Sequence, residues 1–195
     1  SGPRAAMDFV ETPSHLLEHY VWDAQFLSSM GRHHVTGEAI PDDLMQLLRQ
    51  SRNEFKSLDV QNQILYSRFD QALFGPVPTT GELVPSTQIF ASLYGDLTGI
   101  QHAKGTHWHT RFGHLVTYGA GYYGYLYAQA FAADIFHTTA NNPLSRTWGE
   151  RVWRDLLGQG GARDPHVMLK GLLGREPSVE AMFQEMGMTE DNKKQ

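Results

Sequence analysis

Apolar and polar residues alternate along this chain with the 3.6-residue period of helices. Between residues 8 and 21 the large apolar side chains gather on one side of a helical wheel, and the glutamates and histidines gather on the other. That arrangement is typical of a helix with one buried face. The same reasoning predicts further helices at 23–34, 42–55, around 64–73, 86–98, 121–139, 144–158, 165–173 and 177–186. No stretch shows the strict alternation of a strand, so the sequence predicts an all-α fold.

The first helix has two candidate starts. Asp8 followed by Glu11 three residues later is a capping-box pattern, whereas Thr12 could cap a helix that begins at Pro13. Both starts leave Glu11 in or next to the first turn.

The helical pattern also predicts a buried core. We expect the following side chains to be largely buried: Phe9, Leu16, Leu47, Leu65, Phe69, Leu126, Phe131, Trp153 and Leu169.

Composition limits the classes of function. The 195 residues are 41% hydrophobic with a formal charge of -5, and neither sign of charge forms a long run, so nothing favours a nucleic-acid surface or a membrane-binding face. The longest apolar stretch, YLYAQAFAADIF, is interrupted by Gln129 and Asp134 and is too short to span a bilayer. The chain has no cysteine, which excludes disulfides and thiol chemistry.

Residues 15–19 read H-x-x-E-H, the signature of inverted zinc peptidases. The side chains of His15 and His19 would project from the same face of a helix, with Glu18 beside them as a possible base. A third ligand would have to come from later in the chain, and the nearby candidate, Glu82, lies in the loop string GPVPTTGELVPS. An ordinary amphipathic helix explains the same five residues, so both interpretations stay open.

The densest candidate chemistry lies in FGHLVTYGAGYYGYLY, residues 112–127. Glycines let a backbone approach a ligand closely, and tyrosines offer phenolic donors to a carbonyl or a developing oxyanion. The alternative is that the glycines turn the chain while the tyrosines pack. Residues 114–125 contain a histidine, three glycines and four tyrosines, and such a concentration favours a ligand-facing loop.

Three motifs in order carry a family resemblance: DFVETPS at 8–14, the string at 112–127, and GGARDPHVMLKGLLGREPSVEAMF at 160–183. Together they resemble the C-terminal part of the thimet oligopeptidase family of zinc peptidases. The spacing within HLVTYGAGYYGYL is similar to that of the family's mitochondrial branch. The likeness covers residues 1–188, which we assign to the C-terminal part of a zincin-type catalytic domain, and leaves 189–195 as a polar tail.

The resemblance implies roles for particular residues. Glu11 would be the third zinc ligand, and His15 and His19 would not be ligands. His114, Tyr118 and Tyr125 would be catalytic, with the tyrosines hydrogen-bonding the tetrahedral intermediate. The implied substrate-binding residues are His114, Tyr118, Gly119, Gly121, Tyr122 and Tyr125. The implied substrate is an unfolded or presequence-like peptide, and the implied location is the mitochondrial matrix.

Two departures from the family pattern shape the functional prediction. Thr117 stands where the family pattern has a glycine, and no HExxH occurs in the 195 residues. Two zinc-binding histidines and the general base are therefore expected on a partner polypeptide that carries HExxH. The alternative is a non-catalytic, peptidase-derived structural subunit of a mitochondrial complex.

Overall fold

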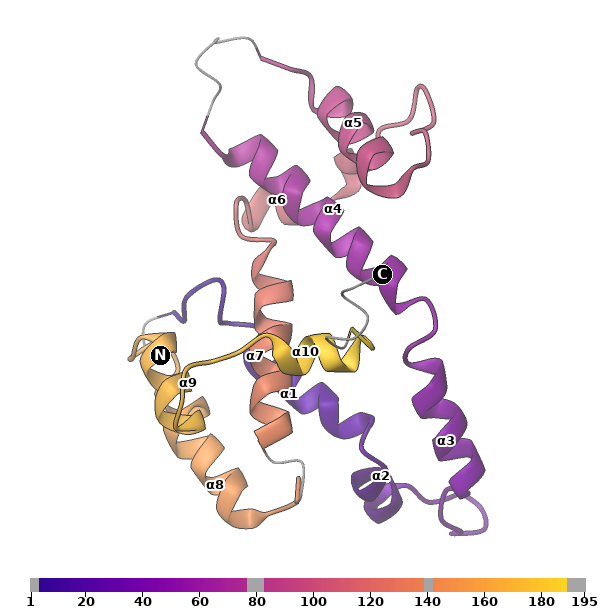
Figure 1. The fold of residues 1–195 in the computed structure, drawn as a ribbon, viewed down its shortest axis with the longest axis vertical. Helices are drawn as coiled ribbons and strands as arrows, with labels where there is room; N and C mark the ends of the chain where they lie inside the picture. Colours follow the sequence, from indigo (N-terminus) through magenta and orange to yellow (C-terminus); the bar gives the residue numbers. More distant parts are fainter. Residues whose placement is uncertain (1–3, 77–82, 139–141, 189–195) are drawn as a thin grey trace. The chain divides into compact units, whose positions relative to one another are not determined.

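The computed structural model describes residues 4–76, 83–138 and 142–188, and over these ranges it is helical and contains no strand. The predicted all-α class is confirmed. The helices are α1 (Thr12–Val21), α2 (Ala24–Met30), α3 (Asp42–Ser51), α4 (Lys56–Phe74), α5 (Ser86–Thr98), α6 (His114–Thr117), α7 (Gly124–Thr138), α8 (Arg146–Asp155), α9 (Pro165–Leu173) and α10 (Glu180–Glu185). Short 3-10 turns lie at Trp108–Arg111 and Leu157–Gln159. Figure 1 shows the course of the chain through these elements. None of the helices in the described ranges is long and apolar enough to cross a bilayer.

The chain forms two compact units. Unit 1 consists of residues 1–56 and 125–195, and unit 2 consists of residues 57–124. Each unit has its own buried apolar side chains and is described by itself.

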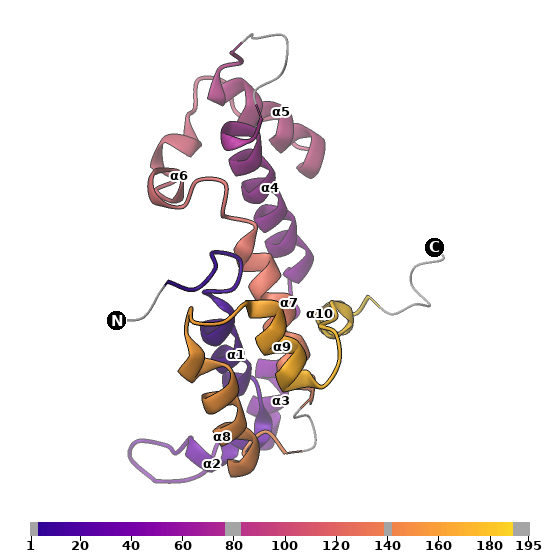
Figure 2. The same cartoon turned by 90° about the vertical axis from the view of Figure 1, so that its left-hand side faces the viewer.

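The core of unit 1 is mainly aliphatic and is built from side chains of α1, α7, α8 and α9 and of residues that flank them. Phe9, which precedes α1, and Leu16 within it are each 3% exposed, and Leu169 of α9 is fully buried. These three predicted core positions are confirmed. The remaining buried members of the cluster are Ala132, Ile135, Val152, Leu156, Met168 and Leu172. Figure 2 shows α8 and α9 side by side in this unit.

The core of unit 2 is mainly aromatic. Phe69 of α4 is fully buried, and its ring meets Phe90 of α5 edge-on at a centroid distance of 5.1 Å. Trp108 stacks on Phe90 at 5.2 Å and on Tyr66 at 4.7 Å. Leu65 is 1% exposed, so the predicted burial of both Leu65 and Phe69 is confirmed.

Side-chain caps fix several helix starts. Asp23, Ser145 and Asp164 each accept a hydrogen bond from a backbone N–H in the first turn of the helix that follows. Helix α1 begins at Thr12, with Glu11 in the cap position, so the start at Asp8 is wrong and the later start is correct to within one residue.

Two predicted helices are too long. Helix α2 ends at Met30 rather than His34, because Gly31 takes an extended conformation and the chain then turns back through an isolated bridge between Arg32 and Ala39. Helix α3 ends at Ser51, and Phe55, with a φ of 59°, separates it from α4.

Two predicted core residues are exposed instead. Leu47 is 58% exposed because α3 turns Met45 inward, and Trp153 is 66% exposed because α8 buries its neighbour Val152. Leu126 and Phe131 are half-buried.

Candidate functional site

The first candidate group in unit 1 brings Glu11 and Tyr125 together. Glu11 occupies the cap position of α1, and its carboxylate lies 3.3 Å from the hydroxyl of Ser14, which donates to the Glu11 main-chain oxygen at 2.8 Å. Tyr125 lies in the first turn of α7. Burial raises the pKa of the Tyr125 phenol, and the negative charge of Glu11 raises that pKa further. The phenol is protonated at neutral pH, as an ordinary tyrosine is, and can donate a hydrogen bond.

His15 lies beside this pair, one turn along α1 from Glu11. Its ring meets that of Tyr125 edge-on at 6.5 Å. Its Nδ1 lies 3.5 Å from the Glu18 carboxylate, and its buried Nε2 has no hydrogen-bond partner among the described residues. His15 thus helps to enclose the tyrosine.

The second candidate group is the His114–Tyr122 segment of unit 2. The ring of His114 lies 6.3 Å from that of Tyr118 and 5.2 Å from that of Tyr122, edge-on in both cases. Tyr122 is 7% exposed and also packs on Phe112 and Tyr66. Its ring therefore has the packing role that the sequence had also allowed, while its backbone belongs to the loop.

The backbone of this segment has an unusual conformation at Ala120. Its φ is 61°, a left-handed conformation that costs an L-residue about 1–2 kcal/mol. On one side, a Cβ added to Gly119 would meet the Phe74 ring at 3.2 Å, so a side chain there would crowd that ring. Gly121 follows on the other side. A small residue on each side of Ala120 allows the tight turn between α6 and α7.

Helix α4 holds this turn through Asp70 and Gln71. The Ala120 N–H donates to Asp70 Oδ1 at 2.9 Å, and the Tyr122 N–H donates to Oδ2 at 3.0 Å. The Gln71 side-chain amide donates to the Ala120 carbonyl at 2.8 Å. Neither residue was a candidate from the sequence. The sequence offers one hint of Asp70: an acidic residue that directly follows Phe69 on the apolar face of a helix is expected to need hydrogen-bond donors.

The predicted site residues therefore form two groups. Unit 1 brings Glu11 and Tyr125 together, and unit 2 brings His114, Tyr118 and Tyr122 together on the loop that contains Gly119 and Gly121. Their catalytic and substrate-binding roles remain predictions.

The H-x-x-E-H residues have other partners. His19 Nδ1 contacts the main-chain oxygen of His15 at 2.8 Å, and its Nε2 lies 3.1 Å from Glu185 Oε1. In the described part of the chain, no group of three or more histidine, aspartate or glutamate side chains is arranged to hold a metal ion. Glu82 lies outside the described residues. The inverted zinc site is therefore not formed by the residues that the structure describes.

An ionic cluster that the sequence did not reveal surrounds Glu185 of α10. His19, Arg52 and His137 lie within 3.3 Å of its carboxylate, at the edge of a cavity of about 310 Å³. Burial alone would raise the pKa of Glu185, but the hydrogen bond with His19 and the positive charges nearby outweigh burial and lower it. The cluster fastens α10 to α1 and α7.

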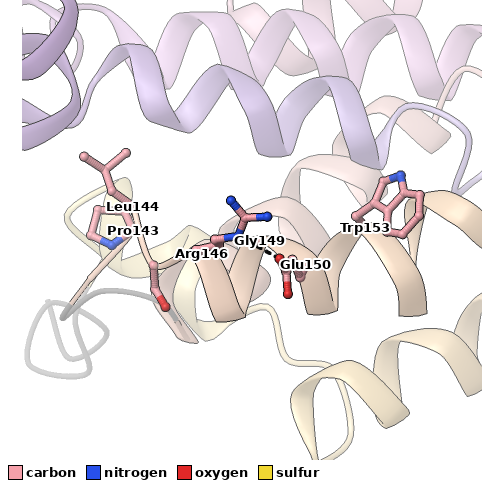
Figure 3. A pocket seen from close by; sticks show the side chains of 7 residues that line it. Pro143, Leu144, Arg146, Gly149, Glu150 and Trp153 are labelled. Carbon is pink, nitrogen blue, oxygen red and sulfur yellow. Dashed lines mark hydrogen bonds and ion pairs between the residues drawn. The ribbon is translucent and has the colours of Figure 1, made fainter.

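A second hollow, of about 380 Å³, lies at the start of α8 (Figure 3). It is lined by Pro143, Leu144 and the exposed ring of Trp153, and Arg146 and Glu150 form an ion pair within it at 2.8 Å. None of the predicted site residues lines this hollow.

Comparison with known proteins identifies the class. The sequence matches the model of peptidase family M3 over residues 1–188, and the chain belongs to this family. It is 42% identical over 177 residues to a protein named mitochondrial intermediate peptidase from Arabidopsis thaliana, an alignment that covers 90% of this chain and 25% of the relative. A mitochondrial intermediate peptidase from Homo sapiens is 34% identical over 181 residues, or 92% of this chain and 25% of the relative. The family and its mitochondrial branch are as the sequence motifs predicted.

The chain spans about a quarter of the length of these relatives. The activity, substrates and partners of a whole peptidase are therefore proposals for this chain.

Proposed function

We propose that this chain is the C-terminal portion of a zinc metalloendopeptidase similar to mitochondrial intermediate peptidase. One arrangement carries the proposal: Glu11 and Tyr125, which come from distant parts of the sequence, lie together in unit 1. The ring of Tyr125 meets that of His15, one turn along α1 from Glu11, and the Glu11 charge acts on the phenol. A carboxylate beside a protonated phenol supplies one metal ligand and one oxyanion donor.

Glu11 fits one position of a catalytic zinc site. Its carboxylate is half-buried, and its only hydrogen bond among those described for the chain is the long one from Ser14, which leaves acceptor capacity for a cation. A catalytic zinc usually has three protein ligands, and it supplies a Lewis acid that activates water. The described residues offer no complete ligand set. As the family resemblance implies, we propose that two histidines and the general base come from an HExxH segment on a partner polypeptide.

The tyrosines supply the second part of the proposed chemistry. Tyr125, like any tyrosine, is a neutral donor at neutral pH, and its raised pKa keeps it neutral further into the alkaline range. A donor of this kind stabilises the negative charge that develops on a carbonyl oxygen during peptide hydrolysis. We propose that His114 and Tyr118, with the backbone at Gly119 and Gly121, contact the peptide. Tyr122 would hold this segment from behind.

The proposed substrate is an unfolded or presequence-like peptide in the mitochondrial matrix. Support comes from the names of the similar proteins, which are mitochondrial intermediate peptidases.

The direct test is reconstitution. The chain is combined with a polypeptide that carries the HExxH part of a related peptidase, and hydrolysis of presequence-like peptides is followed with each component alone and with both. Activity is expected only in the complex, and it should be lost with a chelator and restored by zinc. An inactive zinc-loaded complex would contradict the proposal and favour the structural-subunit alternative.

A further inference from the structure

The loop at 118–122 is held mainly from α4. Asp70 accepts hydrogen bonds from the backbone of Ala120 and Tyr122, and Gln71 donates to the carbonyl of Ala120. Ala120 is therefore tied at both its N–H and its C=O. It is also the residue whose left-handed φ of 61° a side chain disfavours. The hydrogen bonds oppose the tendency of this residue to leave its conformation.

The Asp70 carboxylate is unusual in its surroundings. The residue is 1% exposed, and none of the ion pairs found among the described residues involves it. A buried carboxylate needs hydrogen-bond donors, because its charge has lost the hydration it has in water. The backbone N–H groups of the loop provide them. Burial of Asp70 and the loop conformation therefore depend on each other.

Two side chains at the start of this region, His114 and Tyr118, are those expected to face a peptide. Tyr118 lies two residues before Ala120, and the His114 ring packs against both Tyr118 and Tyr122. A change in the backbone at Ala120 would move these rings, since they come from the same short segment.

We propose that Asp70, assisted by Gln71, is a positioning residue that holds the 118–122 backbone in the conformation presenting His114 and Tyr118 to substrate. This inference rests on the proposed function for its catalytic consequence, but the hydrogen-bonding arrangement can be tested without it. Asp70 touches the loop backbone and acts through the loop on the reacting groups.

The first part of the test is amide hydrogen exchange on the wild-type chain and on Asp70→Asn. The asparagine keeps the shape but turns one acceptor into a donor that faces a backbone N–H, so one hydrogen bond is lost. Protection of the Ala120 or Tyr122 amide should fall about tenfold, while the amides of α4 and α5 keep theirs. Asp96→Asn is the matched control, since Asp96 is an exposed residue of α5 in the same unit and loses the same charge. Unchanged protection in the loop, or an equal loss throughout α4 and α5, would overturn the proposal.

The second part uses the complex with an HExxH-bearing polypeptide. Asp70→Asn should lower kcat by about tenfold or more with a smaller change in KM, and the zinc content should be unchanged. Adding Ala120→Gly should restore part of both the protection and kcat, because glycine adopts a positive φ without strain. A kcat that is unchanged in Asp70→Asn, or not recovered at all in the double variant, would count against positioning. An inactive wild-type complex would instead overturn the proposed function and Asp70's part in catalysis, while the exchange measurement would still decide whether Asp70 holds the loop.

Discussion

The two groups of candidate site residues are held in place by different physical means. In unit 1, Glu11 and Tyr125 lie at the starts of α1 and α7, two helices that bury Leu16 and Ile135 in the same aliphatic core. In unit 2, the His114–Tyr122 segment is a turn whose backbone is held by directional hydrogen bonds from α4.

The two groups should therefore respond differently to substitutions. Burial of apolar surface is non-directional and cumulative, so the helix-borne group should lose its geometry only when its core is damaged. A loop held by a few hydrogen bonds should lose its geometry when one of them is removed, with little effect on the helices beside it.

Damage to the aliphatic core should give the largest effect and disrupt the helix-borne group. Leu16 is 3% exposed, so Leu16→Ala removes buried surface and leaves a cavity, and the free energy of unfolding should fall by about 2–5 kcal/mol. The control is Leu17→Ala, since Leu17 is 59% exposed and its truncation should change stability by less than about 0.5 kcal/mol. Urea unfolding measures both. Equal effects in the two variants would mean that α1 is not held by its buried face.

Removal of the phenolic donor should impair catalysis while the helix-borne group stays folded. Tyr125→Phe should lower kcat of the reconstituted complex by about 100-fold, or roughly 3 kcal/mol, with zinc content and peptide binding nearly unchanged. Tyr127→Phe is the matched control, because Tyr127 lies on the same helix and is 48% exposed. A loss of zinc in Tyr125→Phe would show that the tyrosine supports the metal rather than the oxyanion.

Acid should loosen unit 1 through the Glu185 cluster. The pKa of Glu185 is lower in the folded chain than its ordinary value, so its contribution to stability is present above about pH 4.3 and is lost as the pH falls through the lowered value. Glu185→Gln should cost about 1 kcal/mol at pH 6, because the neutral amide loses the carboxylate's charge-assisted contacts with His19, Arg52 and His137. That difference should shrink toward zero as the pH falls through the lowered pKa of Glu185, which thermal unfolding at a series of acidic pH values measures. A difference that persists at low pH would indicate lost packing instead of lost charge.

The smallest effect is a shift in the titration of Tyr125. Glu11→Gln removes the negative charge near the phenol, so the pKa of Tyr125 should fall toward its ordinary value while remaining raised by burial. Tyrosine ring carbon shifts in NMR follow this titration, and Glu18→Gln serves as the control. Identical titration in wild type and Glu11→Gln would mean that the two side chains do not interact.

Much of the fold could be predicted because the residues that start and stop a helix lie within a few positions of its ends. The segments at 86–98 and 165–173 match α5 and α9, whose ends are marked by proline at the start and a left-handed glycine at the end. Which apolar side chains of α3 and α8 are exposed could not be predicted. Each helix offers two candidates for burial, and tertiary packing buries Met45 rather than Leu47 and Val152 rather than Trp153.

The candidate site could be predicted only as a set of residues. Motif order indicated Glu11, His114, Tyr118 and Tyr125, since each belongs to a short string. The contribution of Asp70 could not be predicted. Its partners are backbone N–H groups 50 and 52 residues away, and a backbone N–H does not depend on the residue type that the sequence records.

We propose that Glu11 is the third ligand of a zinc site whose other two ligands lie on another polypeptide. The most direct test is the zinc content of the complex with an HExxH-bearing partner, measured for wild type, Glu11→Gln and the control Glu18→Gln, which changes an exposed glutamate of the same helix. We expect one zinc per heterodimer in wild type and Glu18→Gln, and a loss of zinc together with activity in Glu11→Gln. Full zinc occupancy in Glu11→Gln, or tight stoichiometric zinc on the isolated wild-type chain that is lost in His15→Ala, would contradict it.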